Sequence, residues 1–132
     1  MECGGRFAIG RIIMPRFVIL EHDHPELHWD LMLQAGETLR TWRLARRPEK
    51  PGDVIEATAI GEHRPMYLDY EGPVSGGRGR VIRWDHGTYK EETAGIIHSE
   101  ECIVVRLEGK HLQGLAVLDR IGGDRWNFRL SG

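Results

Sequence analysis

Alternation of apolar and polar residues over short segments constrains the fold of this chain more than any other feature of its sequence. The segment 28–34 alternates in this way, and the segment 17–22 is rich in apolar and β-branched residues. Gly, Pro and acidic residues fill the connections 35–37 and 48–53. A period of two broken by turn residues is typical of antiparallel β-structure. The segments that we expect to form strands are residues 17–22, 28–34, 38–45, 54–60, 79–84, 88–90, 102–107, 112–118 and 125–130.

The spacing of these segments predicts an all-β fold. Many short strands together with 17 glycines favour a barrel or a sandwich, and we expect a compact, closed or partly open β-barrel. Only residues 91–101 are a candidate for helix, so we expect at most one or two short helices. The tripeptide Asp85-His86-Gly87 has turn composition, and we interpret it as a turn between two strands.

The chain of 132 residues has room for one domain with one hydrophobic core. We expect that domain to span residues 14–132, because Met14 is a natural start just before the first expected strand. Residues 1–13 are then an N-terminal extension, either an extra edge strand or a disordered segment. The chain has no apolar run of about 18 residues, no signal-peptide pattern and only two cysteines. These features predict a cytoplasmic protein with no membrane partner.

The positive charge of the chain is concentrated in arginines. The net charge is −2, which gives no overall attraction for nucleic acid, but 15 of the 18 basic residues are Arg. The planar arginine fork binds phosphate oxygens in pairs. A genome rich in G and C explains the arginine excess more simply, so composition alone does not assign phosphate binding. The two arginine clusters are Arg40, Arg43, Arg46, Arg47 and Arg78, Arg80, Arg83.

Two histidines and a carboxylate are candidates for a metal site. Side chains alternate faces along a strand, so His28 and Asp30 share one face, and a hairpin brings His22 beside them. Such donors suit Mn²⁺, Fe²⁺, Co²⁺ or Zn²⁺, and three protein ligands leave positions open for chemistry. Seven histidines also produce close pairs by chance, and the same donors describe a non-haem iron oxygenase. The spacing therefore leaves the reaction open.

Two further segments carry polar side chains suited to binding. The segment 61–72 gathers His63, Tyr67 and several charged residues in a turn region, although a polar loop that closes a barrel has the same composition. The segment 76–80 is rich in Gly and can expose backbone N–H groups to a phosphate. It lacks the Lys-Ser/Thr ending of a P-loop, and a flexible hairpin loop is the simpler interpretation.

Four motifs occur in the order found in one known family. Residues 16–23 and 27–30 resemble the pattern F-V-x-x-E-H-D followed by L-H-[YW]-D, and residues 63–72 resemble H-P-x-x-Y-x-D-F-E-G. Residues 81–89 resemble V-x-x-W-D-x-G-T-[WY], and residues 112–117 resemble L-x-G-x-[WF]-A-L-V. These patterns are those of the 3′-phosphoesterase domain of bacterial DNA ligase D. The chain resembles a free-standing, diverged member of this family.

The resemblance implies a function. Family members are compact β-barrels that bind Mn²⁺ and process DNA 3′ ends, by removing a 3′-phosphate or a terminal ribonucleotide. Mn²⁺ is therefore the expected cofactor here, with Zn²⁺ or Co²⁺ as alternatives. Expected partners are DNA 3′ ends and separate ligase, polymerase or Ku-type end-joining proteins. Carried over by position, the metal ligands are His22, His28 and Asp30, and the residues at the reacting phosphate are His63, Tyr67 and Arg46.

Two positions depart from the family pattern and leave three hypotheses. Met32 and Ile55 stand where the family has arginines. The first hypothesis is a metal-dependent 3′-phosphoesterase that acts in DNA end repair. The second, which the two departures motivate, is a catalytically weakened or inactive module that binds DNA ends or repair proteins. The third is a phosphoesterase for a small nucleotide.

Overall fold

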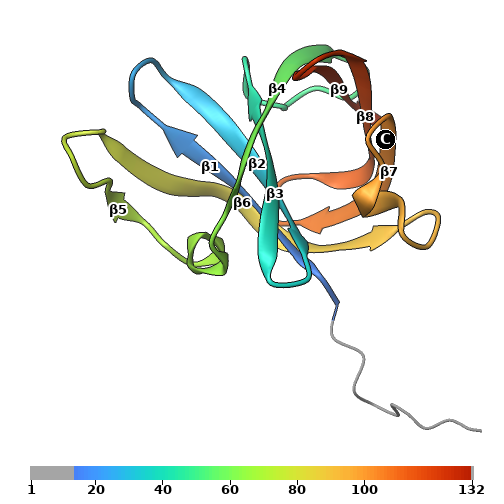
Figure 1. Cartoon of the computed structure of the whole chain (residues 1–132), viewed down its shortest axis with the longest axis horizontal. Helices are drawn as coiled ribbons and strands as arrows, with labels where there is room; N and C mark the ends of the chain where they lie inside the picture. Colours follow the sequence, from blue (N-terminus) through green and yellow to red (C-terminus); the bar gives the residue numbers. More distant parts are fainter. Residues whose placement is uncertain (1–13, 132) are drawn as a thin grey trace, which may run out of the picture.

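The structure is a computed structural model that describes residues 14–131. Eight antiparallel strands form a closed barrel in the order β1-β2-β3-β4-β9-β8-β7-β6, and pairing of β6 with β1 closes it (Figure 1). The short strand β5 pairs only with the start of β6. The strands are β1 (Arg16–His22), β2 (His28–Ala35), β3 (Thr38–Leu44), β4 (Val54–His63), β5 (Gly72–Pro73), β6 (Arg80–Glu91), β7 (Cys102–Gly109), β8 (Gln113–Gly122) and β9 (Arg125–Ser131).

The expectation of an all-β barrel is confirmed. The only helices in the described part of the chain are two 3₁₀ turns, η2 (Pro65–Leu68) and η3 (Ile96–His98). η3 lies within the segment 91–101 that was expected to hold a short helix, whereas η2 lies in a segment expected to be a polar loop. The prediction for residues 1–13 falls outside the described residues. Across residues 14–131, no helix has the length and apolar character needed to cross a bilayer.

The two faces of the strands serve different purposes. Every second side chain of a barrel strand points into the barrel, and residues of the eight barrel strands form most of the main apolar core. In β2, Leu31 and Leu33 belong to this inner core, and both are fully buried. Burial of each such side chain contributes on the order of 1.5–3 kcal/mol to stability. His28, Asp30 and Met32 alternate with them and therefore lie on the outer face.

A second apolar cluster lies on that outer face. It consists of Val18, Leu20, Met32, Leu39, Leu68 and Val81, with Tyr67, Tyr70 and Val74 packed against it. Leu68 and Tyr67 come from η2, so the segment between β4 and β5 covers part of the outer wall of the barrel. The apolar side chains of the outer face beneath this segment are therefore buried.

The interpretation of Asp85-His86-Gly87 as a turn is wrong. β6 runs without interruption from Arg80 to Glu91 and pairs with β1 from Val81 to Thr88. One residue of β6, Trp84, has no partner where Ile19 faces Asp85 and Leu20 faces Arg83, so the strand carries a β-bulge there. A bulge increases the local twist of a strand, and β6 needs this twist where it pairs with β1 to close the barrel.

Asp85 lies within a strand, but its side chain organises a turn elsewhere, the connection from β7 to β8. Its carboxylate is fully buried, and it accepts hydrogen bonds from the backbone N–H groups of Lys110, His111 and Leu112 at 2.7–2.9 Å. These residues form the connection from β7 to β8. Gly87 is required for a separate reason, because a Cβ at this position would lie 2.0 Å from the carbonyl oxygen of Glu108.

Candidate metal centre

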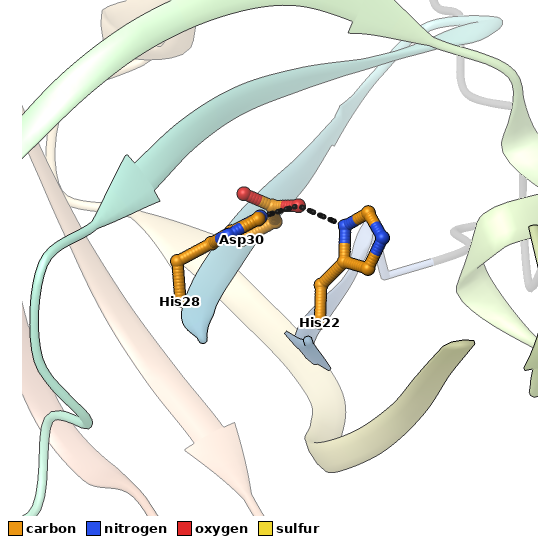
Figure 2. Close-up of side chains that lie close together, drawn as sticks. All are labelled: His22, His28 and Asp30. Atoms are coloured by element: carbon orange, nitrogen blue, oxygen red, sulfur yellow. Dashed lines mark hydrogen bonds and ion pairs between the residues drawn. The ribbon is translucent and has the colours of Figure 1, made fainter. Parts of the chain in front are cut away.

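The β1–β2 hairpin brings His22, His28 and Asp30 together on the outer face of the barrel. His22 and His28 are directly opposite each other in the strand register, and Leu20 is opposite Asp30. One ligand atom from each of the three residues lies within 4.8 Å of the other two (Figure 2). His28 and Asp30 are buried, and the side chain of His22 is only 14% exposed.

Backbone carbonyls orient both imidazole rings. Nδ1 of His28 lies 2.8 Å from the carbonyl oxygen of Glu26, and Nε2 of His22 lies 2.8 Å from that of Arg78. A carbonyl only accepts, so each of these nitrogens donates its proton. The other nitrogen of each neutral ring then carries a lone pair. These two nitrogens face Oδ2 of Asp30, at 3.2 Å from Nε2 of His28 and 3.9 Å from Nδ1 of His22.

This arrangement fits a divalent cation. Three acceptor atoms that point at one another repel unless a proton or a cation lies between them. The second oxygen of Asp30, Oδ1, is buried and has no hydrogen-bond partner among the described residues. Two ligand atoms that bind the same ion, each at about 2.0–2.2 Å, lie no more than roughly 4.4 Å apart. The two histidine nitrogens lie 3.2 and 3.9 Å from Oδ2, within this limit. A histidine that binds a metal through one ring nitrogen usually donates the N–H of its other ring nitrogen to an acceptor such as a carbonyl oxygen, as both rings do here.

The cluster opens into a cavity of about 260 Å³ on the outer wall. His22 and Asp30 line this cavity together with His63, Tyr67 and Met32. The resemblance implied that His63 and Tyr67 face the reacting group, and the structure places both in the same cavity as the candidate ligands. Their assignment as catalytic residues remains a prediction.

His63 and Tyr67 lie four positions apart, one at the end of β4 and the other in the helical turn that follows. His63 ends β4, and its Nδ1 donates to the carbonyl oxygen of Gly61 at 2.8 Å, which leaves Nε2 available to a ligand. Tyr67 lies in η2 and packs edge-on against His63, with ring centroids 5.7 Å apart. Asp69, just after η2, pairs with Arg16 of β1 at 2.6 Å. That hydrogen bond holds the pKa of Asp69 below its usual value.

The other positions taken from the resemblance lie apart. Arg46 lines a different cavity, of about 740 Å³, where its guanidinium donates to the carbonyl oxygen of Val54 at 2.8 Å. The structure does not bring it to the metal ligands. Ile55 packs in the inner core opposite Phe128, so an arginine at this position would be buried among apolar side chains. Met32 is 1% exposed and forms part of the apolar cavity wall.

Two arginines that no motif singled out line the cavity instead. Arg43 stands opposite Asp30 in the β2–β3 register, and Arg78 lies in the connection from β5 to β6. Strand pairing could have indicated Arg43, because it alternates with the inward-facing Trp42 and Leu44. The sequence offered Arg78 only as part of an arginine cluster and of the glycine-rich segment 76–80, and nothing local indicated its contact with His22, which is 56 positions away.

A reciprocal contact joins the two loops beside the cluster. The backbone N–H of Arg80 donates to the carboxylate of Asp23 at 2.8 Å, and the N–H of Asp23 lies 3.4 Å from the carbonyl oxygen of Arg80. The donated hydrogen bond is the main reason that the pKa of Asp23 is lowered. His24 follows directly and also lines the cavity.

Comparisons with known proteins agree with the order of the motifs. The family described as "DNA Ligase D 3'-phosphoesterase domain" matches residues 20–120. The chain is 33% identical over 115 residues to the multifunctional non-homologous end joining DNA repair protein LigD of Mycobacterium tuberculosis. It is 28% identical over 124 residues to the LigD protein of Mycolicibacterium smegmatis.

These alignments cover most of this chain and a small part of each relative. They include 83% and 84% of this chain but only 15% and 16% of the two relatives. A shorter match, 32% identical over 78 residues, links it to the LigD protein of Pseudomonas aeruginosa, covering 56% of this chain and 9% of the relative. The matched region contains the β1–β2 hairpin from Leu20 onward, with all three candidate ligands. The chain belongs to the family of the DNA ligase D 3′-phosphoesterase domain.

Proposed function

We propose that this chain is a metal-dependent phosphoesterase that acts on DNA 3′ ends, where it removes a 3′-phosphate or a terminal ribonucleotide. The observation that carries the proposal is the convergence of His22, His28 and Asp30 around Oδ2 of the buried carboxylate. Family membership supports phosphoesterase chemistry. The relatives are named for non-homologous end joining, which supports DNA ends as the substrate.

The residues of the hairpin hold the cofactor in this proposal. Mn²⁺ is the first choice, and Zn²⁺ or Co²⁺ suits the same two imidazoles and one carboxylate. Such an ion, when bound, supplies Lewis-acid polarisation of a phosphoryl oxygen and lowers the pKa of a bound water. The carbonyl of Glu26 keeps Nδ1 of His28 protonated, so that Nε2 stays a ligand.

His63, at the end of β4, and Tyr67, in η2, bind the reacting group. Nε2 of His63 is free to pair with a phosphoryl oxygen or to exchange a proton with it, because Nδ1 is committed to Gly61. The hydroxyl of Tyr67 donates to the same group and fixes its orientation. The Arg16–Asp69 pair holds η2 against β1 and so keeps Tyr67 in place.

The relatives also suggest how the chain acts in a cell. They combine this domain with a much larger remainder, since the alignments cover only 15–16% of their length. We therefore propose that separate ligase, polymerase or Ku-type end-joining proteins act on the ends that this chain prepares. The 3′-hydroxyl left by phosphate removal is the group that a polymerase or ligase extends or seals.

Release of inorganic phosphate from a 3′-phosphorylated primer annealed to a template tests the proposal. The wild-type chain should release phosphate with Mn²⁺ and not with a chelator. His28→Ala and Asp30→Asn should reduce the rate by at least ~100-fold, which is typical for loss of a ligand or of its ion. His98→Ala is the matched control, because His98 is an exposed histidine of η3 outside the cavity. No metal-stimulated release by the wild type would refute the proposal.

The same preparation separates the two alternatives. Salt-sensitive binding of the primer–template without release would identify a non-catalytic DNA-end module. Release from a nucleoside 3′-monophosphate, but not from the primer–template, would identify a small-nucleotide phosphoesterase. A primer with a terminal ribonucleotide tests the second activity on DNA.

A further inference from the structure

The charges that line the metal cavity are unbalanced. Asp30 is the one carboxylate among the described residues that line the cavity, whereas Arg43 and Arg78 contribute two guanidinium groups. If Asp30 binds a cation, no carboxylate remains in the cavity to neutralise either arginine. The imbalance indicates an anion as the natural occupant of the space beside the cluster.

Arg43 is placed next to Asp30 without forming a hydrogen bond to it. The two residues are direct partners across β2 and β3, so their side chains share the outer face. Nε of Arg43 lies 3.7 Å from Oδ1 of Asp30, which is beyond hydrogen-bond distance. That Nε is buried and has no partner among the described residues, while the side chain as a whole is 41% exposed.

This geometry leaves the donors of Arg43 free. An arginine opposite an aspartate normally closes into a pair of hydrogen bonds at about 2.7–2.9 Å. Here a carboxylate oxygen and a guanidinium nitrogen that both lack partners stand side by side. The cation site accounts for the free oxygen, and the exposed part of the Arg43 side chain can bind an anion.

Arg78 approaches the cluster from the other side. Its carbonyl oxygen accepts the hydrogen bond from Nε2 of His22. Its Nε and Nη2 donate to the carbonyl and hydroxyl oxygens of Ser75, at 2.7 and 3.1 Å. These bonds hold the guanidinium in one orientation and leave Nη1 without a protein acceptor in the described part of the chain. Arg78 is exposed, and it lines the cavity.

The strand order puts the candidate ligands between the two arginines. Arg43 lies on β3, His28 and Asp30 on β2, His22 on β1, and Arg78 just before β6. We infer that Arg43 and Arg78 form a two-arginine clamp that binds the oxygens of a terminal phosphomonoester on both sides of the metal centre. The inference rests on the proposed function, because it places the phosphoryl group in the same cavity.

The clamp also determines which phosphate the cavity prefers. A terminal phosphomonoester carries up to two negative charges and three free oxygens, enough for both arginines and the cation. A phosphodiester within a strand carries one charge and has only two free oxygens. The clamp therefore binds a terminal monoester more tightly than a diester, including the diester that joins a terminal ribonucleotide to the strand.

Binding of inorganic phosphate, measured by calorimetry with and without Mn²⁺, tests the clamp separately from turnover. Arg43→Gln and Arg78→Gln should each weaken phosphate binding by about tenfold to a hundredfold, as expected for loss of a charged hydrogen bond. Mn²⁺ binding should change by less than about twofold, since neither side chain is a ligand. Arg43→Lys should recover only part of the affinity, because it restores the charge but not the fork.

Arg106→Gln is the matched control, because Arg106 is an exposed arginine of β7 outside the cavity. It should bind phosphate like the wild type. Unchanged phosphate affinity in Arg43→Gln and Arg78→Gln, or no phosphate binding by the wild type, would overturn the clamp. If Arg43→Gln does not fold, Arg43→Lys and Arg78→Gln carry the same test. A wild type that binds phosphate through both arginines but releases none from DNA would refute the proposed function and leave the clamp standing.

Discussion

Nε2 of His28 and Oδ2 of Asp30 lie 3.2 Å apart, and both are acceptors when the histidine is neutral. A buried contact between two acceptors is unfavourable unless a proton or a cation lies between them, and at a pH at which His28 is neutral the metal-free protein has neither. Asp30→Asn should therefore raise the stability of the metal-free protein, by about 1 kcal/mol, because an amide N–H can donate to Nε2. The same change should abolish stabilisation by Mn²⁺, which for the wild type reaches about 2.7 kcal/mol at 100 times Kd. Thermal unfolding with Mn²⁺ and with a chelator measures both effects. A metal-free variant less stable than the wild type would contradict this account.

Asp85 should be the most sensitive polar residue of the barrel. Its buried carboxylate accepts three backbone N–H groups from the β7–β8 connection, at Lys110, His111 and Leu112. Asp85→Ala leaves these donors without an acceptor, and we expect a loss of roughly 3–5 kcal/mol in the free energy of unfolding. Urea denaturation measures the loss. Asp119→Ala provides the comparison, because this half-exposed carboxylate lies 3.8 Å from Arg129 and should contribute less than about 1 kcal/mol.

Gly87 should tolerate no side chain. A Cβ at this position would lie 2.0 Å from the carbonyl oxygen of Glu108, and a paired strand cannot move away without losing its hydrogen bonds. Gly87→Ala should destabilise the protein by more than about 3 kcal/mol or prevent folding. Gly122→Ala is the matched control, since a Cβ there meets nothing within 4 Å. Equal unfolding midpoints for the two variants would show that the approach of β6 to β7 is looser than described.

Asp23 should make stability depend on pH in the acid range. The N–H of Arg80 lowers the pKa of Asp23 below its ordinary value of 3.8 in the folded protein. A lowered folded pKa means that the contact stabilises the protein fully above the ordinary value and is lost as the pH falls through the folded value. Asp23→Ala should thus be less stable than the wild type at neutral pH, and the difference should shrink as the pH falls below 3.8. A carboxyl titration followed by NMR reports the pKa directly, and a value at or above 3.8 would argue against the contact.

The strands were predictable where local pattern alone determines them. Leu31 and Leu33 alternate with His28 and Asp30, and this alternation survives in the structure because one face packs in the core. The turn expected at Asp85-His86-Gly87 was wrong because its composition reflects contacts 21 or more positions away. Asp85 binds the backbone of residues 110–112, and Gly87 admits the backbone of Glu108. A sequence shows the residue types but not these contacts between distant positions.

The residues of the candidate site also differ in whether a local pattern or a contact between distant positions brings them together. His22, His28 and Asp30 fall within nine consecutive residues, so one hairpin and its spacing suffice to bring them together. Arg43 and Arg78 reach the cavity only through the pairing of β3 with β2 and the packing of the β5–β6 connection against β1. Motif alignment therefore pointed to Arg46, whose side chain is held at Val54 in another cavity.

The outward orientation of the site has a consequence for how this protein can change over evolutionary time. Core packing and candidate chemistry occupy alternate positions of the same strands, with Leu31 inside and Asp30 outside. Substitutions at outward positions can thus retune ligand preference while the inner core stays intact. Deletion of a single residue in β2 has the opposite effect, because it moves every later side chain of that strand to the other face. Such a deletion removes the ligand set and the core together, so the site diversifies by replacement and not by changes in strand length.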